Sequence, residues 1–110
     1  MAQHLLAEGY KDAAAVMIGG VLEEHLRQLC LTHGVAISTS KAGVDVPRKA
    51  DALNADLAKA NVYGKLDQKN VTAWLDLRND AAHGHYTRYT ADQVEIMHRG
   101  FLEFAARVSI

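Results

Sequence analysis

The sequence predicts an all-α fold, a four- to five-helix up-and-down bundle that forms one domain over residues 1–110. Apolar residues recur at steps of three and four along most of the chain, strand-like alternation is scarce, and proline occurs once. A chain of 110 residues with 49% hydrophobic residues can bury only a modest core. A partner subunit would extend that core, so we expect an oligomer.

The first long helix is expected at about residues 10–32. Its buried stripe contains residues spaced by three and four, and the helix has a natural stop at Gly34. Gly19 and Gly20 lie inside this helix and suggest a close crossing with another helix. Residues 2–8 are a candidate for a short additional helix.

The middle of the chain is expected to hold a loop and two helices. Segment 34–47 mixes Gly, Ser, Thr and Pro without a helical period and therefore predicts a loop. Apolar stripes predict a short helix at about 48–61 and a longer one at about 66–83, which buries Val71 and Trp74.

The last helix has the clearest signals. Thr90 and Gln93 are spaced as in a capping box, which marks a helix start. An apolar seam with bundle-like spacing follows: Val94, Met97, Phe101, Phe104 and Val108. We therefore expect this helix to close the bundle.

Composition limits the classes of function. Twelve basic residues against thirteen acidic ones give a net charge of −1, which argues against a nucleic-acid coat protein but allows a local basic site. The one cysteine, Cys30, leaves neither a disulfide nor a cysteine zinc site. No apolar run approaches the ~18 residues of a membrane span, and no secretion signal is visible. We therefore expect a cytoplasmic protein without membrane attachment, and no motif predicts a cofactor.

The segment DLRNDAAHGHY, residues 76–86, holds the candidate site. One stripe of its helix is polar: Asp76, Asn79, Asp80 and His83. Arg78 lies instead at the edge of the apolar stripe, where its stem would cover the core and its head would meet a glutamate from the first long helix. Arg78 and His83 are about 140° apart around the axis and about 7.5 Å along it, so a single helix aims both at one phosphate only awkwardly. Two copies meeting across a two-fold axis would do so.

These residue types suit RNA cleavage without a metal. Histidine can act as general base or acid on the ribose 2′-OH and the leaving oxygen, and arginine can neutralise charge on the phosphate. The spacing alone is weak, because a chain of this composition gives about one Arg-to-His match by chance. Arg27 and His33 form a second match.

The surrounding sequence resembles the HEPN superfamily of small α-helical bundles. AVMIGGVLEEHLRQLC resembles its second helix, WLDLRNDAAHG its motif helix and TADQVEIMHRGFLEFAARV its closing helix. The family signature is an arginine, usually followed by a polar residue, and then a histidine after four to six positions. The resemblance implies that Arg78 and His83 are the catalytic pair and that Asn79 assists them, whereas Arg27 and His33 occupy the wrong helix.

The resemblance also implies a function. Active HEPN proteins are metal-independent endoribonucleases, found in toxin–antitoxin and phage-defence systems, whose site forms between two protomers. We therefore expect a homodimer with RNA as substrate and an antitoxin or other partner protein. In one toxin branch a tyrosine often stands two residues after the histidine, whereas this chain has His85 there and Tyr86 next.

Several further residues are candidates for binding. Tyr86, Arg88 and Tyr89 follow the motif and would stack a base and hold a phosphate, or else serve as ordinary loop residues. His85 is a further binding candidate. Glu24, or its neighbour Glu23, would orient Arg78.

Two other functions stay open. The first is a non-catalytic HEPN-like interaction module that binds nucleic acid, nucleotide or a partner protein. The second and weaker one is a metal site at His83 and His85, perhaps with Asp80. A good site needs three or four ligands, so we expect no metal.

Overall fold

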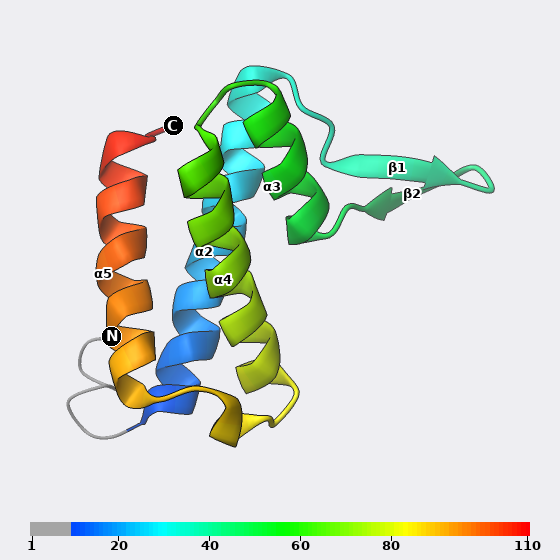
Figure 1. Cartoon of the computed structure of the whole chain (residues 1–110). Coiled ribbons are helices and arrows are strands. Elements are labelled where there is room, and N and C mark those ends of the chain that lie inside the picture. Colours follow the sequence, from blue (N-terminus) through cyan, green and yellow to red (C-terminus); the bar gives the residue numbers. More distant parts are fainter. Residues whose placement is uncertain (1–9) are drawn as a thin grey trace.

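The computed structural model describes residues 10–110, so the helix considered at residues 2–8 lies outside the described part. Helices and strands follow one another along the chain as shown in Figure 1: α2 (Lys11–His33), β1 (Ser38–Lys41), β2 (Val44–Pro47), α3 (Ala50–Lys59), α4 (Lys65–Ala82), the short 3-10 helix η1 (Tyr86–Arg88) and α5 (Ala91–Arg107). The chain is mainly α-helical, as predicted.

Helix α2 is the centre of the bundle. It packs against α3, α4 and α5, and α4 runs in the opposite direction to α2 and α5 (Figure 1). The core is apolar and collects the predicted stripes of all four helices; its largest fully buried side chains are Leu22, Leu26, Leu29, Leu53, Leu57, Val71, Leu75, Val94, Met97 and Phe104. Removing this apolar surface from water is the main force that holds the bundle together.

The predicted helix signals at Gly34 and Thr90 are confirmed. Gly34 ends α2 in the left-handed region, with φ 72°, and its N–H donates to the Cys30 carbonyl. At the start of α5 the Gln93 N–H donates to Thr90 Oγ1 at 3.1 Å, and the Thr90 N–H donates to Gln93 Oε1 at 2.8 Å. Both ends therefore satisfy backbone groups that a helix terminus leaves unpaired.

The predicted loop over 34–47 is wrong in one respect, because most of it forms an antiparallel β-hairpin. The register pairs Ser38 with Pro47. Ala42 and Gly43 connect the strands with φ values of 52° and 78°, and positive φ at both turn positions matches the twist of a two-residue hairpin. Most of the hairpin is exposed; β1 has no apolar residue and β2 alternates only over Val44, Asp45 and Val46, which is too short a pattern to predict a strand.

The crossing predicted at the paired glycines occurs at Gly19 alone. A Cβ on Gly19 would lie 2.0 Å from Cγ of Arg78, so α2 and α4 meet closely there, whereas a Cβ on Gly20 would have open space. Trp74 was expected to be buried but is half-buried, because it reaches sideways to α5 and packs edge-on to Phe104.

None of the helices in the described part of the chain combines the length and the apolar character that a membrane span requires.

Candidate functional site at the end of helix α4

A polar hollow of about 330 Å³ lies between α2, the start of α3 and the end of α4. We call it the motif hollow. All three predicted catalytic residues line it, together with residues from the other two helices: Glu23, Lys49, Ala50, Asp51, Leu75, Arg78, Asn79 and His83. The structure thus brings together residues that are up to 60 positions apart in the sequence, from Glu23 to His83.

Arg78 and His83 reach this hollow within one chain. The angular estimate made such a meeting awkward for one helix and favoured a second copy. Helix α4 ends at Ala82, however, and His83 stands at its C-cap with φ −96° and ψ 8°, outside regular helical values. One chain therefore presents both side chains to the same space, and a second copy is not needed for their meeting.

Arg78 is held from two sides. Its aliphatic stem lies against Gly19, and its Nη2 donates to Glu23 Oε2 at 3.3 Å. The prediction that a glutamate of the first long helix meets Arg78 is confirmed, and that glutamate is Glu23. Glu24 lies elsewhere, exposed, and accepts a hydrogen bond from Gln28 at 2.8 Å. Glu23 is thus the residue placed to orient the motif arginine.

Arg27, the arginine of the second Arg-to-His match, also contacts Glu23. Its Nη2 lies 3.6 Å from Glu23 Oε1 and donates to the Arg48 carbonyl at 2.8 Å. Arg27 is therefore part of a polar chain that runs from Arg78 through Glu23 to Arg48. His33 has no part in this chain.

Two of the candidate binding residues after the motif, His85 and Arg88, lie beside Asp80. Asp80 Oδ1 is 3.1 Å from Arg88 Nη1 and 3.5 Å from His85 Nδ1. Tyr86 is exposed, and its carbonyl accepts from Lys11 Nζ at 2.6 Å. None of these three candidates lines the motif hollow.

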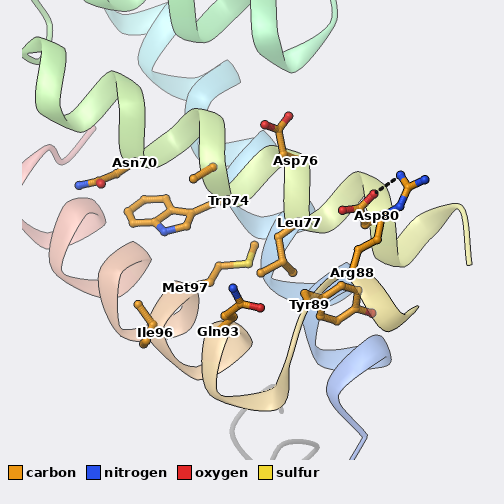
Figure 2. A pocket seen from close by; sticks show the side chains of 11 residues that line it. Asn70, Trp74, Asp76, Leu77, Asp80, Arg88, Tyr89, Gln93, Ile96 and Met97 are labelled. Carbon is orange, nitrogen blue, oxygen red and sulfur yellow. Dashed lines mark hydrogen bonds and ion pairs between the residues drawn. The ribbon is translucent and has the colours of Figure 1, made fainter. Parts of the chain in front are cut away.

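Arg88 and Asp80 instead border a second hollow of about 480 Å³, which we call the α4–α5 hollow. Figure 2 shows the Asp80–Arg88 ion pair at its rim and the apolar side chains between the two helices: Trp74, Leu77, Ile96 and Met97. This hollow was not predicted, because the sequence pattern gives no spacing between two packed helices.

The loop after the motif is fastened to the start of α2. Lys11 Nζ donates to the carbonyls of Tyr86 and Tyr89 and lies 3.9 Å from the centroid of the Tyr89 ring. Tyr89, which was expected to stack a base, is instead buried, and its hydroxyl donates to Asp12. Burial, and then this hydrogen bond to a carboxylate, raise the pKa of Tyr89 well above its usual value.

The weaker metal hypothesis finds no ligand cluster in residues 10–110. No three His, Cys, Asp or Glu side chains in that range are arranged to hold an ion. The rings of His83 and His85 are 6.3 Å apart between centroids, and His85 faces Asp80.

Lys49 and Asp51 are the residues of the motif hollow that sequence reasoning missed. Both come from the start of α3, and no motif links them to the end of α4. The charges of the hollow are thus Arg78 and Lys49 against Glu23 and Asp51, with the His83 imidazole beside them. Guanidinium, ammonium and imidazole groups around one polar space suit an anionic ligand such as a phosphate.

Comparison with known proteins gives no match to a family model, a curated protein or a solved structure. The structure itself shows a mainly helical bundle with a polar hollow where three of its helices meet.

Proposed function

We propose that this protein is a metal-independent endoribonuclease whose catalytic residues are Arg78, Asn79 and His83. The observation that carries the proposal is that these three side chains line one polar hollow. The HEPN resemblance supports the same three residues on independent grounds, since it rests on sequence patterns along the chain.

The chemistry needs one proton acceptor, one proton donor and stabilisation of a phosphorane-like transition state. His83 takes the proton of a ribose 2′-OH, and the 2′-oxygen attacks the adjacent phosphorus. The bond from phosphorus to the 5′-oxygen breaks, which leaves a 2′,3′-cyclic phosphate and a protonated 5′-hydroxyl on the two fragments. Arg78 and the amide of Asn79 donate to the phosphate oxygens as charge develops on them.

A homodimer would supply the second proton-transfer group that a single motif hollow lacks. Among residues 10–110, only the His83 imidazole lines the motif hollow, while base and acid are two roles. Two hollows facing each other across a two-fold axis would provide a second His83 for the leaving oxygen. A site shared by two copies is therefore proposed because the reaction needs two proton-transfer groups. The angle between Arg78 and His83 does not require it.

The biological setting that we propose is a cytoplasmic toxin or phage-defence effector restrained by an antitoxin or another partner protein. This part of the proposal rests on the HEPN resemblance. An intracellular ribonuclease needs such restraint, because single-stranded and transfer RNA are always present around it.

The test is cleavage of single-stranded RNA and transfer RNA in EDTA by the wild type, His83→Ala and His85→Ala. His85 is the matched control, since it is two residues away and faces Asp80. We expect His83→Ala to lower the cleavage rate by about 100-fold or more and His85→Ala to stay within about twofold. Full activity of His83→Ala, or loss of wild-type activity in EDTA, would refute the proposal.

One observation favours a non-catalytic module instead. Within residues 10–110 the His83 side chain has no hydrogen-bond partner to set its tautomer, and Arg78 is already paired with Glu23. Such a module would bind an oligonucleotide, a nucleotide or a partner protein through the same hollow. A wild-type protein that binds RNA, forms dimers and cleaves no RNA would establish this alternative.

A further inference from the structure

We propose that Lys49 is a phosphate-binding residue of the motif hollow and that it holds single-stranded RNA beside the phosphate at Arg78 and His83. The inference rests on the proposed function and extends it to a residue outside the motif. It starts from the position of Lys49, which lines the hollow from the N-cap of α3.

Lys49 differs from Arg78 in having its charge available. Arg78 shares Glu23 with Arg27, so both arginines are partly neutralised. The ammonium of Lys49 is exposed, and within residues 10–110 it has no carboxylate within ion-pair distance and no hydrogen bond. A phosphate that binds there does not have to displace an existing partner, which makes Lys49 the most accessible cation of the hollow.

The backbone that carries Lys49 is fixed in place. The preceding residue, Arg48, donates from its backbone N–H to the Ile37 carbonyl at 2.9 Å, and its Nη2 lies 2.8 Å from Asp56 Oδ2. Its own carbonyl accepts from Arg27 at 2.8 Å. The polar chain that begins at Arg78 therefore ends one residue before Lys49, so it holds the Arg78 side chain and the backbone next to Lys49. Binding then costs mainly the ordering of the Lys49 side chain.

The start of α3 provides a further attraction for an anion. The Lys49 carbonyl accepts from the N–H groups of Ala52 and Leu53. The N–H groups that come before these at the start of a helix have no acceptor within the helix and are free to bind a ligand. These free donors and the helix dipole favour a negative group near Lys49. Asp51, which is exposed and also lines the hollow, opposes such a group by like-charge repulsion.

The test is binding of a single-stranded 2′-O-methyl RNA, which cannot be cleaved, over a range of salt concentrations. The proteins are the wild type, Lys49→Ala, Lys49→Arg and Lys59→Ala; Lys59 is the matched control at the other end of α3. We expect Lys49→Ala to weaken binding by about 3- to 10-fold and to reduce the slope of log Kd against log salt by about 0.7, the value of one phosphate contact. Lys49→Arg and Lys59→Ala should keep the wild-type slope.

The effect of Asp51→Asn on RNA affinity is a second test of phosphate binding in the motif hollow. Removing this carboxylate should tighten binding by about 2- to 5-fold in the wild type, as expected for one like charge near a phosphate. The increase should be smaller in Lys49→Ala, because the phosphate is then held less closely. Wild-type affinity and slope in Lys49→Ala, an equal loss in Lys59→Ala, or no binding by the wild type would each overturn the inference.

The two proposals fail in different ways. A slope change in Lys49→Ala without any RNA cleavage by the wild type would remove the ribonuclease proposal and keep Lys49 as a binding residue. Cleavage that depends on His83, together with unchanged binding and cleavage in Lys49→Ala, would remove Lys49 and keep the ribonuclease. Circular dichroism checks that the exposed substitution leaves the helices intact.

Discussion

Two groups of charged residues at the end of α4 are built on opposite principles. Around Asp80, Arg88 and His85 both lie within 3.5 Å of one carboxylate oxygen, so the local charges are paired among themselves. At the motif hollow, Glu23 forms ion pairs with both Arg27 and Arg78. Lys49 has no acidic partner within residues 10–110. Neighbours in the sequence thus belong to two different electrostatic environments.

The difference shows why proximity to a motif is a poor guide to function. An ion pair that is already formed must be broken before either partner can hold a ligand. The folded protein has already desolvated and ordered the two side chains of that pair, so breaking it loses their attraction. An unpaired cation such as Lys49 binds an anion without that loss, whereas Arg78 shares its charge with Glu23. The proposed function therefore centres on the motif hollow, and we expect a local structural role for the Asp80 group.

The largest expected contrast is between the two arginines. Arg78→Ala should lower RNA cleavage by about 100-fold or more, because the phosphate loses its guanidinium donors. Arg88→Ala should stay within about twofold, because Arg88 faces Asp80. Rates are measured under single-turnover conditions, with thermal unfolding to check the fold. Equal losses in both variants would show that the comparison between the two groups is mistaken.

Next in size is the contrast between the two glycines of α2. Gly19→Ala should lower the free energy of unfolding by about 1–3 kcal/mol, because the new methyl group collides with the stem of Arg78 close to its backbone. Gly20→Ala faces open space and should raise it by up to about 1 kcal/mol through helix propensity. Urea unfolding measures both changes. The packing of Arg78 on Gly19 is contradicted if the two substitutions have the same sign.

Tyr89→Phe examines the loop that follows the motif. Losing the hydrogen bond from the buried hydroxyl to Asp12 should cost about 1 kcal/mol at neutral pH. The raised pKa of Tyr89 means that the folded state keeps this proton more tightly than the unfolded chain does. The stabilisation is therefore complete below about pH 10, the usual tyrosine value, and is lost as pH rises above it.

Unfolding free energies between pH 8 and 11 test this pH dependence. The wild type should lose stability above about pH 10 more steeply than Tyr89→Phe does. The variant should still show some decline, because burial also raises the pKa of Tyr63. Identical alkaline slopes in the two proteins would mean that Tyr89 contributes nothing to the pH dependence.

The smallest effect is expected for Asp80→Asn. Its partners are largely exposed, with side-chain exposures of 61% for Arg88 and 47% for His85, so water screens the lost attraction. The free energy of unfolding should fall by about 0.5 kcal/mol or less, and cleavage by the motif hollow should not change. A loss of cleavage would tie the two charged groups together and undo their separation.

The helices could be predicted because their signals are local. The apolar stripe of α5, its cap at Thr90 and the stop at Gly34 each depend on residues within a few positions of one another. The hairpin could not, because β1 has no apolar residue, β2 alternates over only three residues, and the turn is formed by Ala42 and Gly43 without the asparagine or aspartate typical of such turns.

The site could be predicted only along α4. The spacing alone was weak, and the resemblance of the surrounding sequence selected Arg78, Asn79 and His83, which the structure brings to one hollow. Their partners come from other helices: the choice of Glu23 over Glu24 depends on how α2 is rotated, and Lys49 enters through the packing of α3. Neither fact is encoded in a pattern of neighbouring residues.

The fluorescence of Trp74 can distinguish binding in the α4–α5 hollow from binding in the motif hollow. Trp74 is the only tryptophan of the chain, it packs beside Gly100 and Phe104, and it lines the α4–α5 hollow without lining the motif hollow. Its intrinsic fluorescence therefore reports on anything that enters between α4 and α5 and stays nearly silent when an oligonucleotide occupies the other side. A titration can thus assign a ligand to one region or the other without attaching a label to the protein.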